Sequence, residues 1–277
     1  MRELLINFYK QLKESVLITL DFNTENKENL YKIDNNYKVI EKNINAKLSG
    51  YSLNNTIIYK KNNNIIIEEI NENNKDYIKE KIELAFKNNT LYGVPTYFTD
   101  STKQIDKALF LDRDGVINKD TGYIDSIDRI ILIEDFFDVV RKANEKGYKV
   151  IVTTNQSGIS YGYYSEETLN DIHNFIKEEY RKRNCIIDDF YYCPYHIKGN
   201  IDKYKLETVL RKPDAGMHLL ASKKYNIDLS KSIMIGDRDS DIIQIPFLKT
   251  YLIQTENYEI ENKKNIINNI KEIYNYL

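Results

Sequence analysis

The sequence predicts a Rossmann-like α/β fold, in which a parallel sheet carries helices on both faces. After residue 106, short apolar runs alternate with amphipathic segments, as in a series of β-α units. The apolar runs are nearly continuous, which is typical of parallel strands covered on both sides. Turn-forming residues gather in the same region, since only Gly50, Gly93 and Pro95 precede residue 106.

Each element of this sheet follows from the local pattern. Gly147 can end a helix near 134–146, Ser165 can cap the next helix, and Pro213 can open a third because its missing N–H costs nothing there. The segment 259–276 has the spacing of a final amphipathic helix. We expect the strands at 107–112, 148–154, 188–193, 232–237 and 249–253.

The region before residue 106 is predicted to contain a separate, small α/β domain at 1–94. Its expected elements are helices at 2–14 and 75–88, a strand at 15–20, and two strands around the turn at 60–64. The segment 95–105 begins with a proline and shows little apolar periodicity, so we expect a linker there. The second predicted domain, at 106–277, carries the parallel sheet.

The composition describes an ordinary globular protein without an excess of positive charge. The 277 residues include 40 Lys and Arg and 42 Asp and Glu, giving a formal net charge of -2, so we expect neither a nucleic-acid nor a membrane partner. The only cysteines are Cys185 and Cys193, which is typical of a reducing compartment. The N-terminus lacks the pattern of a signal peptide, and no stretch is long enough to span a bilayer. These features predict a cytoplasmic protein.

Charged and polar side chains end the predicted strands. Asp112 and Asp114 follow the first strand in "FLDRDGVIN", although burying unpaired carboxylates is costly. Taken alone, "DRDG" also fits a simple turn. The second strand ends in "TTNQSG", the fourth ends in "GDRDSD", and "RKP" lies in a loop before a helix. Because ligands bind at the carboxyl ends of parallel strands, four such segments on one edge predict a functional site rather than a set of helix caps.

The residue types in this cluster suit phosphoryl transfer. Asp112, Asp114 and Asp237 would form an oxygen-rich, negative site of the kind that binds Mg²⁺. Asp112 could attack phosphorus to form an aspartyl-phosphate, while Asp114 passes a proton to the leaving group and then accepts one from water. Donors for the anion would come from Lys212, Thr154, Asn155 and Ser157.

The same motifs resemble, in order and spacing, those of the haloacid dehalogenase superfamily of phosphohydrolases. Within it, "FLDRDGVIN", "TGYI", "VTTNQSGISYG", "YYCPYH" and "RKPDAGM" are similar to the D-glycero-D-manno-heptose-1,7-bisphosphate phosphatases and the related histidinol-phosphate phosphatases. The resemblance covers residues 106–255. It implies a haloacid dehalogenase-like fold with a minimal cap, and hence an open site for a small phosphorylated sugar or metabolite.

The resemblance also implies a role for each matching residue. Asp112 is the nucleophile and a magnesium ligand, and Asp114 is the general acid/base, which also binds the metal through its backbone carbonyl. Asp237 completes the metal site, and Thr154 and Lys212 hold the transferring phosphate. The residues that face the substrate are Asn155, Gln156, Ser157 and Arg211.

The sequence departs from the family pattern at two places. Arg238 stands where the family often has Lys beside the metal aspartate. The structural zinc site of the family is reduced to Cys193, because Tyr195 replaces the expected His. The two later cysteines of that site are replaced by Thr208 and Leu210. His196 could approach a metal with Cys193, but two ligands do not make a tetrahedral site. We therefore expect no structural zinc, and a loop held by packing that includes Tyr204.

Residues 1–105 resemble the later half of sugar-phosphate nucleotidyltransferases in the order of a helix, strands and a closing segment. The segments involved are "ELLINFYKQLKESVLITL", "LSGYSLNNTIIYKK" and "LYGVPTYFTDSTKQIDKAL". The glycine-rich phosphate loop and the metal aspartate of those enzymes are not found in this sequence. The resemblance therefore implies a remnant that stabilises or dimerises the protein but transfers no nucleotide.

The preferred interpretation is a magnesium-dependent phosphatase acting on a sugar phosphate, with heptose 1,7-bisphosphate as the first choice of substrate. Histidinol phosphate or another small phosphomonoester is the alternative, because loops set specificity. A non-catalytic scaffold that recruits a pathway partner is the alternative of a different class. The presence of both Asp112 and Asp114 argues against it. The sequence does not determine the oligomeric state.

Overall fold

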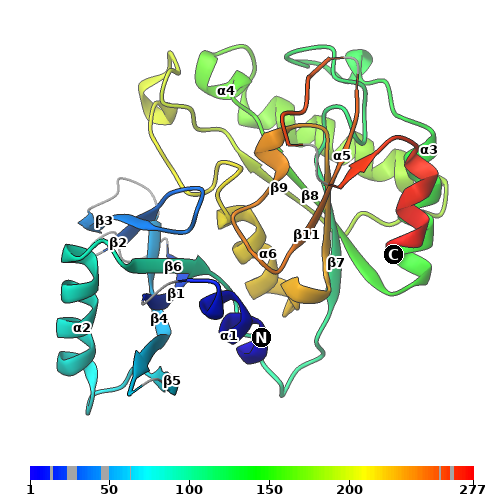
Figure 1. Ribbon diagram of the computed structural model, residues 1–277. Coiled ribbons are helices and arrows are strands. Elements are labelled where there is room, and N and C mark those ends of the chain that lie inside the picture. Colours follow the sequence, from blue (N-terminus) through cyan, green and yellow to red (C-terminus); the bar gives the residue numbers. More distant parts are fainter. Residues whose placement is uncertain (13–14, 24–29, 45–49, 63, 256, 263–264) are drawn as a thin grey trace. The chain divides into compact units, whose positions relative to one another are not determined.

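The computed structural model divides the chain into two compact units. The first unit contains Met1–Phe98 together with Gln244–Phe247, and the second contains Thr99–Ile243 and Leu248–Leu277 (Figure 1). The structure describes residues 1–12, 15–23, 30–44, 50–62, 64–255, 257–262 and 265–277.

The second unit is built on a parallel six-stranded sheet, which confirms the predicted Rossmann-like fold. The strand order is β12-β11-β10-β7-β8-β9, so β7 lies in the middle of the sheet. The strands are β7 (Lys107–Leu111), β8 (Tyr148–Asn155), β9 (Asp189–Cys193), β10 (Ile233–Gly236), β11 (Lys249–Ile253) and β12 (Ile266–Ile267). The helices are α3 (Asp135–Glu145), α4 (Gly158–Tyr161), α5 (Glu166–Lys182) and α6 (Gly216–Tyr225).

Helices cover both faces of this sheet, as the continuous apolar strands predict. On one face, Leu109 and Val150 pack in a single buried cluster with residues of α3 and α5, such as Phe136 and Ile172. On the other face, the ring of His218 from α6 lies 4.6 Å from the ring of Phe110 on β7. Both faces of the sheet are therefore covered by packed side chains, and the polar side chains lie at its carboxyl edge.

Local sequence explains where these helices begin and end. The Ser165 hydroxyl accepts a hydrogen bond from the Thr168 N–H, so the predicted cap of α5 is confirmed. The helix expected from Pro213 begins three residues later, at Gly216. The reason is that the preceding residues form a turn, in which the Gly216 N–H donates to the Val209 carbonyl at 2.8 Å.

The prediction of a helix at 259–276 is wrong. Asn265 has a φ of 56°, which interrupts any helix through this segment. Ile266 and Ile267 pair with β11 as the short strand β12 instead. Asn269 then caps a 3₁₀ turn, η5 (Ile270–Asn275), which packs its buried Ile273 against the sheet cluster.

The first unit contains a six-stranded sheet in the order β3-β2-β4-β1-β6, with β5 paired to β4. Strands β1 and β6 run parallel, and the other pairs are antiparallel. The strands are β1 (Val16–Asn23), β2 (Leu30–Ile33), β3 (Val39–Ile44), β4 (Gly50–Lys61), β5 (Asn64–Glu69) and β6 (Leu91–Pro95), and the helices are α1 (Arg2–Lys10) and α2 (Lys75–Lys87). The expected helix 2–14 therefore ends earlier, and its last two residues lie outside the described ones. Strands β2, β3 and β6 were not predicted from the sequence.

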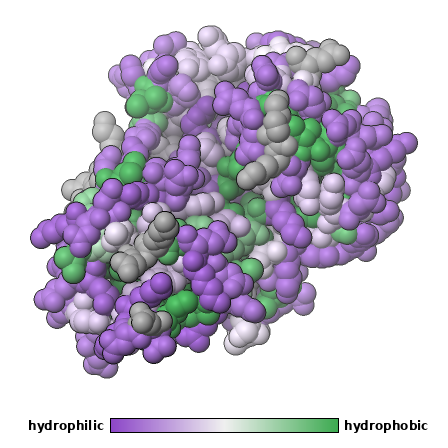
Figure 2. All heavy atoms as spheres, in the orientation of Figure 1, coloured by the Kyte–Doolittle hydropathy of each residue, from purple (hydrophilic) through white to green (hydrophobic). Residues whose placement is uncertain are grey.

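The face of the protein seen in Figure 2 is mainly hydrophilic, and its hydrophobic residues form small, separate patches. Within the part of the chain that the structure describes, no helix is both long enough and apolar enough to cross a bilayer.

Candidate active site

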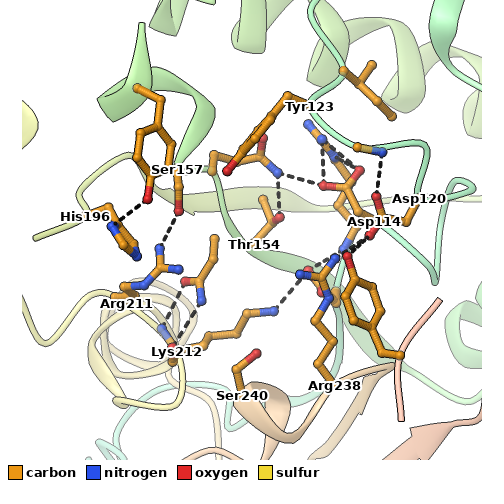
Figure 3. Close-up of a pocket in the computed structure, with 18 of the residues that line it drawn as sticks. Asp114, Asp120, Tyr123, Thr154, Ser157, His196, Arg211, Lys212, Arg238 and Ser240 are labelled. Atoms are coloured by element: carbon orange, nitrogen blue, oxygen red, sulfur yellow. Dashed lines mark hydrogen bonds and ion pairs between the residues drawn. The ribbon is translucent and has the colours of Figure 1, made fainter. Parts of the chain in front are cut away.

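A polar cavity of about 560 Å³ opens at the carboxyl edge of the parallel sheet. The described residues that line it belong to the second unit, and they come from the end of β8, from the segments that follow β7, β8, β10 and β11, and from the loop before α6. Most of the predicted site residues meet here: Asp112, Asp114, Thr154, Asn155, Gln156, Ser157, Arg211 and Lys212 line this cavity (Figure 3).

Three buried carboxylates form an acidic cluster beside the cavity. Asp112, Asp237 and Asp241 each offer an oxygen, and these oxygens lie within 4.8 Å of one another. Asp237 is fully buried, and neither of its carboxylate oxygens has a hydrogen-bond partner. Burial raises the pKa of Asp237 to about 8, with the charges of Asp112 and Asp241 adding to the rise. Such an arrangement calls for a cation, and the donor set fits a hard divalent ion.

The sequence reasoning missed Asp241. It placed the side chain of Asp114 in the acidic cluster, because alternate residues of an extended strand share a face. Strand β7 ends at Leu111, however, and the chain turns before Asp114, so Asp241 supplies the third carboxylate of the cluster. The signal was present in "GDRDSD", where an acidic residue follows Asp237 by four positions in a tight 3₁₀ turn, η4 (Asp239–Asp241).

Lys212 is a buried cation that links two members of this cluster. Its Nζ atom lies 3.0 Å from Asp112 Oδ1 and 2.5 Å from Asp241 Oδ1. Burial alone would lower the pKa of Lys212, but the two carboxylates outweigh it and raise the pKa. Burial raises the pKa of Asp112 to about 6; Lys212 opposes this rise, and Asp241 contributes to it. The backbone N–H of Arg113 also donates to Asp112 Oδ1, at 2.7 Å, so one oxygen of this carboxylate is held in place.

Asp114 is held in a different way, by donors on three sides. The buried Arg113 guanidinium bonds both of its oxygens, and Asn118 and Gln156 donate to them at 2.9 and 3.0 Å. Burial would raise the pKa of Asp114, but Arg113 and these hydrogen bonds outweigh burial and lower it. Asp114 is therefore ionised at neutral pH, next to the cavity.

The polar residues after β8 divide into two groups. Asn155 exchanges two hydrogen bonds with the backbone of Lys212, at 3.0 and 3.1 Å, and Gln156 contacts Asp114, Thr154 and Tyr164. Both amides are thus engaged within the protein. Ser157 differs, because its hydroxyl accepts a hydrogen bond from a cation that lines the cavity.

That cation is Arg211, whose Nη1 atom lies 2.8 Å from Ser157 Oγ and 3.4 Å from the carbonyl oxygen of Tyr195 (Figure 3). Burial lowers the pKa of Arg211, although a guanidinium remains charged at neutral pH. The cavity therefore has Lys212 beside the acidic cluster and a further positive charge, supplied by Arg211, beside Ser157.

Comparison with known families agrees with this geometry. The sequence model of the haloacid dehalogenase-like hydrolases matches residues 21–243, which is more than half of the chain. The protein belongs to the haloacid dehalogenase-like hydrolase family. The match begins in the first unit, whereas the motifs of the resemblance described above lie in the second unit.

Two relatives of this hydrolase carry closely related names. A D-glycero-alpha-D-manno-heptose-1,7-bisphosphate 7-phosphatase from Burkholderia mallei is 42% identical over 136 residues, which cover 49% of this chain and 72% of the relative. A D-glycero-beta-D-manno-heptose-1,7-bisphosphate 7-phosphatase from Haemophilus influenzae is 39% identical over 138 residues, which cover 50% and 74%.

Solved structures share the fold of this hydrolase. A protein from Mesorhizobium loti, described as a haloacid dehalogenase-like phosphatase, is 28% identical with a TM-score of 0.55 over 63% of this chain and 87% of its own. A heptose bisphosphate phosphatase from B. bronchiseptica has a TM-score of 0.53 at 24% identity, over 61% and 96%.

In this hydrolase the loop after β9 is held by a carboxylate. Glu166, the first residue of α5, accepts hydrogen bonds from the hydroxyls of Tyr204 and Tyr192, the latter at 2.7 Å. Tyr204 also packs in a buried cluster with Tyr164 and residues of α4 and α5. This cluster fixes the loop that leads to Arg211.

Cys193 and His196, the two residues that a zinc site of the family would still find here, each contact another group of the protein. Cys193 is fully buried and its thiol contacts the carbonyl of Tyr195, while His196 Nδ1 lies 3.1 Å from the hydroxyl of Tyr161. Among the described residues, neither belongs to a group of three metal-binding side chains.

Arg238, the other departure from the family pattern, turns toward the rim of the cavity. Its guanidinium pairs with Asp120 and lies 3.7 Å from the centre of the Tyr258 ring, and its Nε atom lies 3.6 Å from Asp237. The Tyr258 hydroxyl also donates to Asp120, at 2.9 Å. Arg238 therefore ties the C-terminal segment to the loop after β7.

Proposed function

We propose that this hydrolase is a magnesium-dependent phosphatase that acts on a heptose 1,7-bisphosphate through an aspartyl-phosphate on Asp112. One observation carries the proposal. The Asp112 carboxylate is fixed by Lys212, and it lies beside the buried Asp237, whose two oxygens accept no hydrogen bond. A nucleophile, a cation for the phosphate and a cation-binding cluster thus meet at one strand end.

The first step forms a bond between an Asp112 oxygen and phosphorus and breaks the bond from phosphorus to the sugar oxygen. Lys212 balances the negative charge of the phosphoryl oxygens, and Thr154 lies at the end of β8 beside them. Asp114 gives the departing oxygen a proton. The negative phosphate favours the protonated form of Asp114 when it binds, because a nearby like charge raises a carboxyl pKa.

The second step is the hydrolysis of the aspartyl-phosphate. Asp114, now ionised, takes a proton from water, the water oxygen attacks phosphorus, and the bond from phosphorus to Asp112 breaks. The donors from Arg113, Asn118 and Gln156 stabilise the ionised form that this step needs.

The acidic cluster would hold Mg²⁺ through Asp112 and Asp237, with the backbone carbonyl of Asp114 as a further ligand. When bound, the ion would neutralise part of the negative charge that the phosphate brings to the cluster. Asp241 is engaged by Lys212 and by the backbone N–H groups of Asp237 and Arg238, so its role is to hold these residues in place.

The choice of substrate rests on the names of the relatives and on Arg211. A bisphosphate brings a second anion, and Arg211 offers a charge for it beside the Ser157 hydroxyl. Histidinol phosphate would instead bring an ammonium group toward this guanidinium, and like charges repel. We therefore prefer the sugar bisphosphate. The described residues of the first unit do not include any that line the cavity, and this unit has a non-catalytic role in this proposal.

The test is phosphate release by the purified protein from heptose 1,7-bisphosphate and from histidinol phosphate, with Mg²⁺ and with EDTA. We expect magnesium-dependent turnover with a clear preference for the bisphosphate. Asp112→Asn should abolish turnover and keep the fold, because it removes the nucleophile with little change in volume. A preference for histidinol phosphate would refute the substrate, and near-normal turnover by Asp112→Asn would refute the mechanism.

A further inference from the structure

An aromatic wall lines one side of the cavity. Tyr123 in the loop after β7, Tyr161 at the end of α4 and His196 in the loop after β9 line the cavity, and Tyr163 packs against Tyr123. The ring centres of Tyr123 and Tyr161 lie 6.0 Å apart, those of Tyr123 and Tyr163 lie 4.6 Å apart, and those of Tyr161 and His196 lie 5.4 Å apart. Three separate segments of the chain thus bring their rings close together; Figure 3 shows Tyr123 and His196 beside the cavity.

Core packing does not account for these rings. Tyr123 is 44% exposed and Tyr163 is 55% exposed, whereas Tyr164, the next residue in the chain, is 9% exposed and donates its hydroxyl to Gln156. A single exposed tyrosine needs no explanation, but several in mutual contact at the mouth of a cavity form a binding surface. Tyr163 supports Tyr123 from behind, since Tyr123 and Tyr161 are the two tyrosines of the wall that line the cavity.

The backbone holds both lining tyrosines in position. Arg129 donates to the carbonyl of Tyr123 at 2.8 Å, and the next residue, Ile124, is fully buried. The N–H of Tyr161 donates to the Ser157 carbonyl, and Gly162, with a φ of 84°, ends α4 directly after it. Little ordering of the wall is therefore needed when a ligand binds.

The groups around the wall define the ligand. A ring face that carries C–H bonds suits the negative face of an aromatic ring. A flat nucleobase would stack as well, but it would need amide partners for its polar edge. The amides of Asn155 and Gln156 are already engaged within the protein, and Arg211 supplies a positive charge nearby. This combination fits a cyclic sugar that carries phosphate.

We infer that Tyr123 and Tyr161 form a subsite that stacks against the ring of a cyclic sugar phosphate and so selects it over an open-chain polyol phosphate. The inference rests on the proposed function, and it adds the residues that recognise the part of the substrate that does not react. The hydroxyls of the two tyrosines are not required, because the ring faces make the contact.

Calorimetry tests the subsite without turnover. The protein carries Asp112→Asn so that no ligand is consumed, Mg²⁺ is present, and the probes are glucose 6-phosphate, sorbitol 6-phosphate and uridine 5′-monophosphate. We expect glucose 6-phosphate to bind at least about fivefold more tightly than the other two, as one aromatic contact allows. Adding Tyr123→Ala or Tyr161→Ala should remove this preference, while Tyr123→Phe and Tyr161→Phe should keep it.

Tyr276→Ala is the matched control, because Tyr276 is an exposed tyrosine that stacks on Tyr251 and does not line the cavity. It should keep the preference for the ring. The inference would be overturned if glucose 6-phosphate and sorbitol 6-phosphate bound equally well, or if neither bound. It would also be overturned if uridine 5′-monophosphate bound more tightly, or if the preference for glucose 6-phosphate survived both alanine variants. Phosphate release by the unaltered enzyme tests the proposed function separately. A failure of the tyrosine subsite can therefore be distinguished from a failure of the proposed function.

Discussion

Replacing Gly115 by alanine should disable the acidic cluster through a single methyl group. Gly115 has a φ of 84°, and a Cβ atom there would lie 2.0 Å from Asp237 Oδ2. Moving this oxygen out to 3.4 Å, where ordinary contact begins, requires a shift of about 1.4 Å. Misplacing a catalytic group by 1 Å can cost about a hundredfold in rate. We therefore expect turnover to fall about a hundredfold and the magnesium concentration for half-maximal activity to rise.

Gly147→Ala separates this effect from backbone strain. Gly147 has a similar φ of 74° just after α3, but apart from its chain neighbours no described residue has a heavy atom within 4 Å of a Cβ added there. Both variants should lose about 1–2 kcal/mol of unfolding free energy from the left-handed backbone. Only Gly115→Ala should lose turnover, after correction for the folded fraction measured by thermal unfolding. If the two variants had the same turnover and magnesium response, the reasoning about Asp237 would be refuted.

Two further predictions concern charge and the loop after β9. Without metal, the melting temperature should fall as pH rises from 5 to 8. The folded protein keeps protons on Asp112 up to a pKa of about 6 and on Asp237 up to about 8, while the unfolded chain loses them near 3.8. Added Mg²⁺ should therefore raise the melting temperature more at pH 8 than at pH 5.5. An equal rise at both pH values would contradict the prediction that Mg²⁺ binds the acidic cluster. Tyr204→Phe removes the hydrogen bond to Glu166 and should cost about 1 kcal/mol of stability, whereas Tyr276→Phe should cost nothing measurable. Metal analysis that found one zinc per chain would contradict this account of the loop.

The sequence predicted those parts of the site that depend on strand ends. Strands β7, β8 and β10 are short and apolar, so their carboxyl ends, with Asp112 and Asp237, could be placed on one edge. The partners of these residues could not be placed, because they depend on the turns that follow. Asp241 enters the cluster through a 3₁₀ turn, and the Asp114 side chain leaves it because the strand has ended.

The missed elements have related causes. Strands β2 and β3 are short runs on either side of the turn residues 34–36, and β6 contains Gly93 and ends at Pro95, two residues that weaken a strand pattern. The apolar spacing near the C-terminus fits a helix, but Asn265 adopts a left-handed backbone and the two isoleucines after it pair with the sheet edge. Side chains with strong local preferences overrode a periodic pattern there.

The first unit includes Gln244–Phe247, a segment that is translated long after Met1–Phe98, the rest of that unit. The ring of Phe247 lies 6.5 Å from that of Phe8, in the cluster around Leu5 and Tyr9. A ribosome that adds about 5–20 residues per second needs roughly seven to thirty seconds to pass from Phe98 to Phe247. During that interval the emerging N-terminal segment lacks one of its aromatic packing partners. The first unit is therefore translated first but completed only when Phe247 has been added, after most of the second unit has been made, and a nascent chain stalled before Phe247 would leave that cluster open.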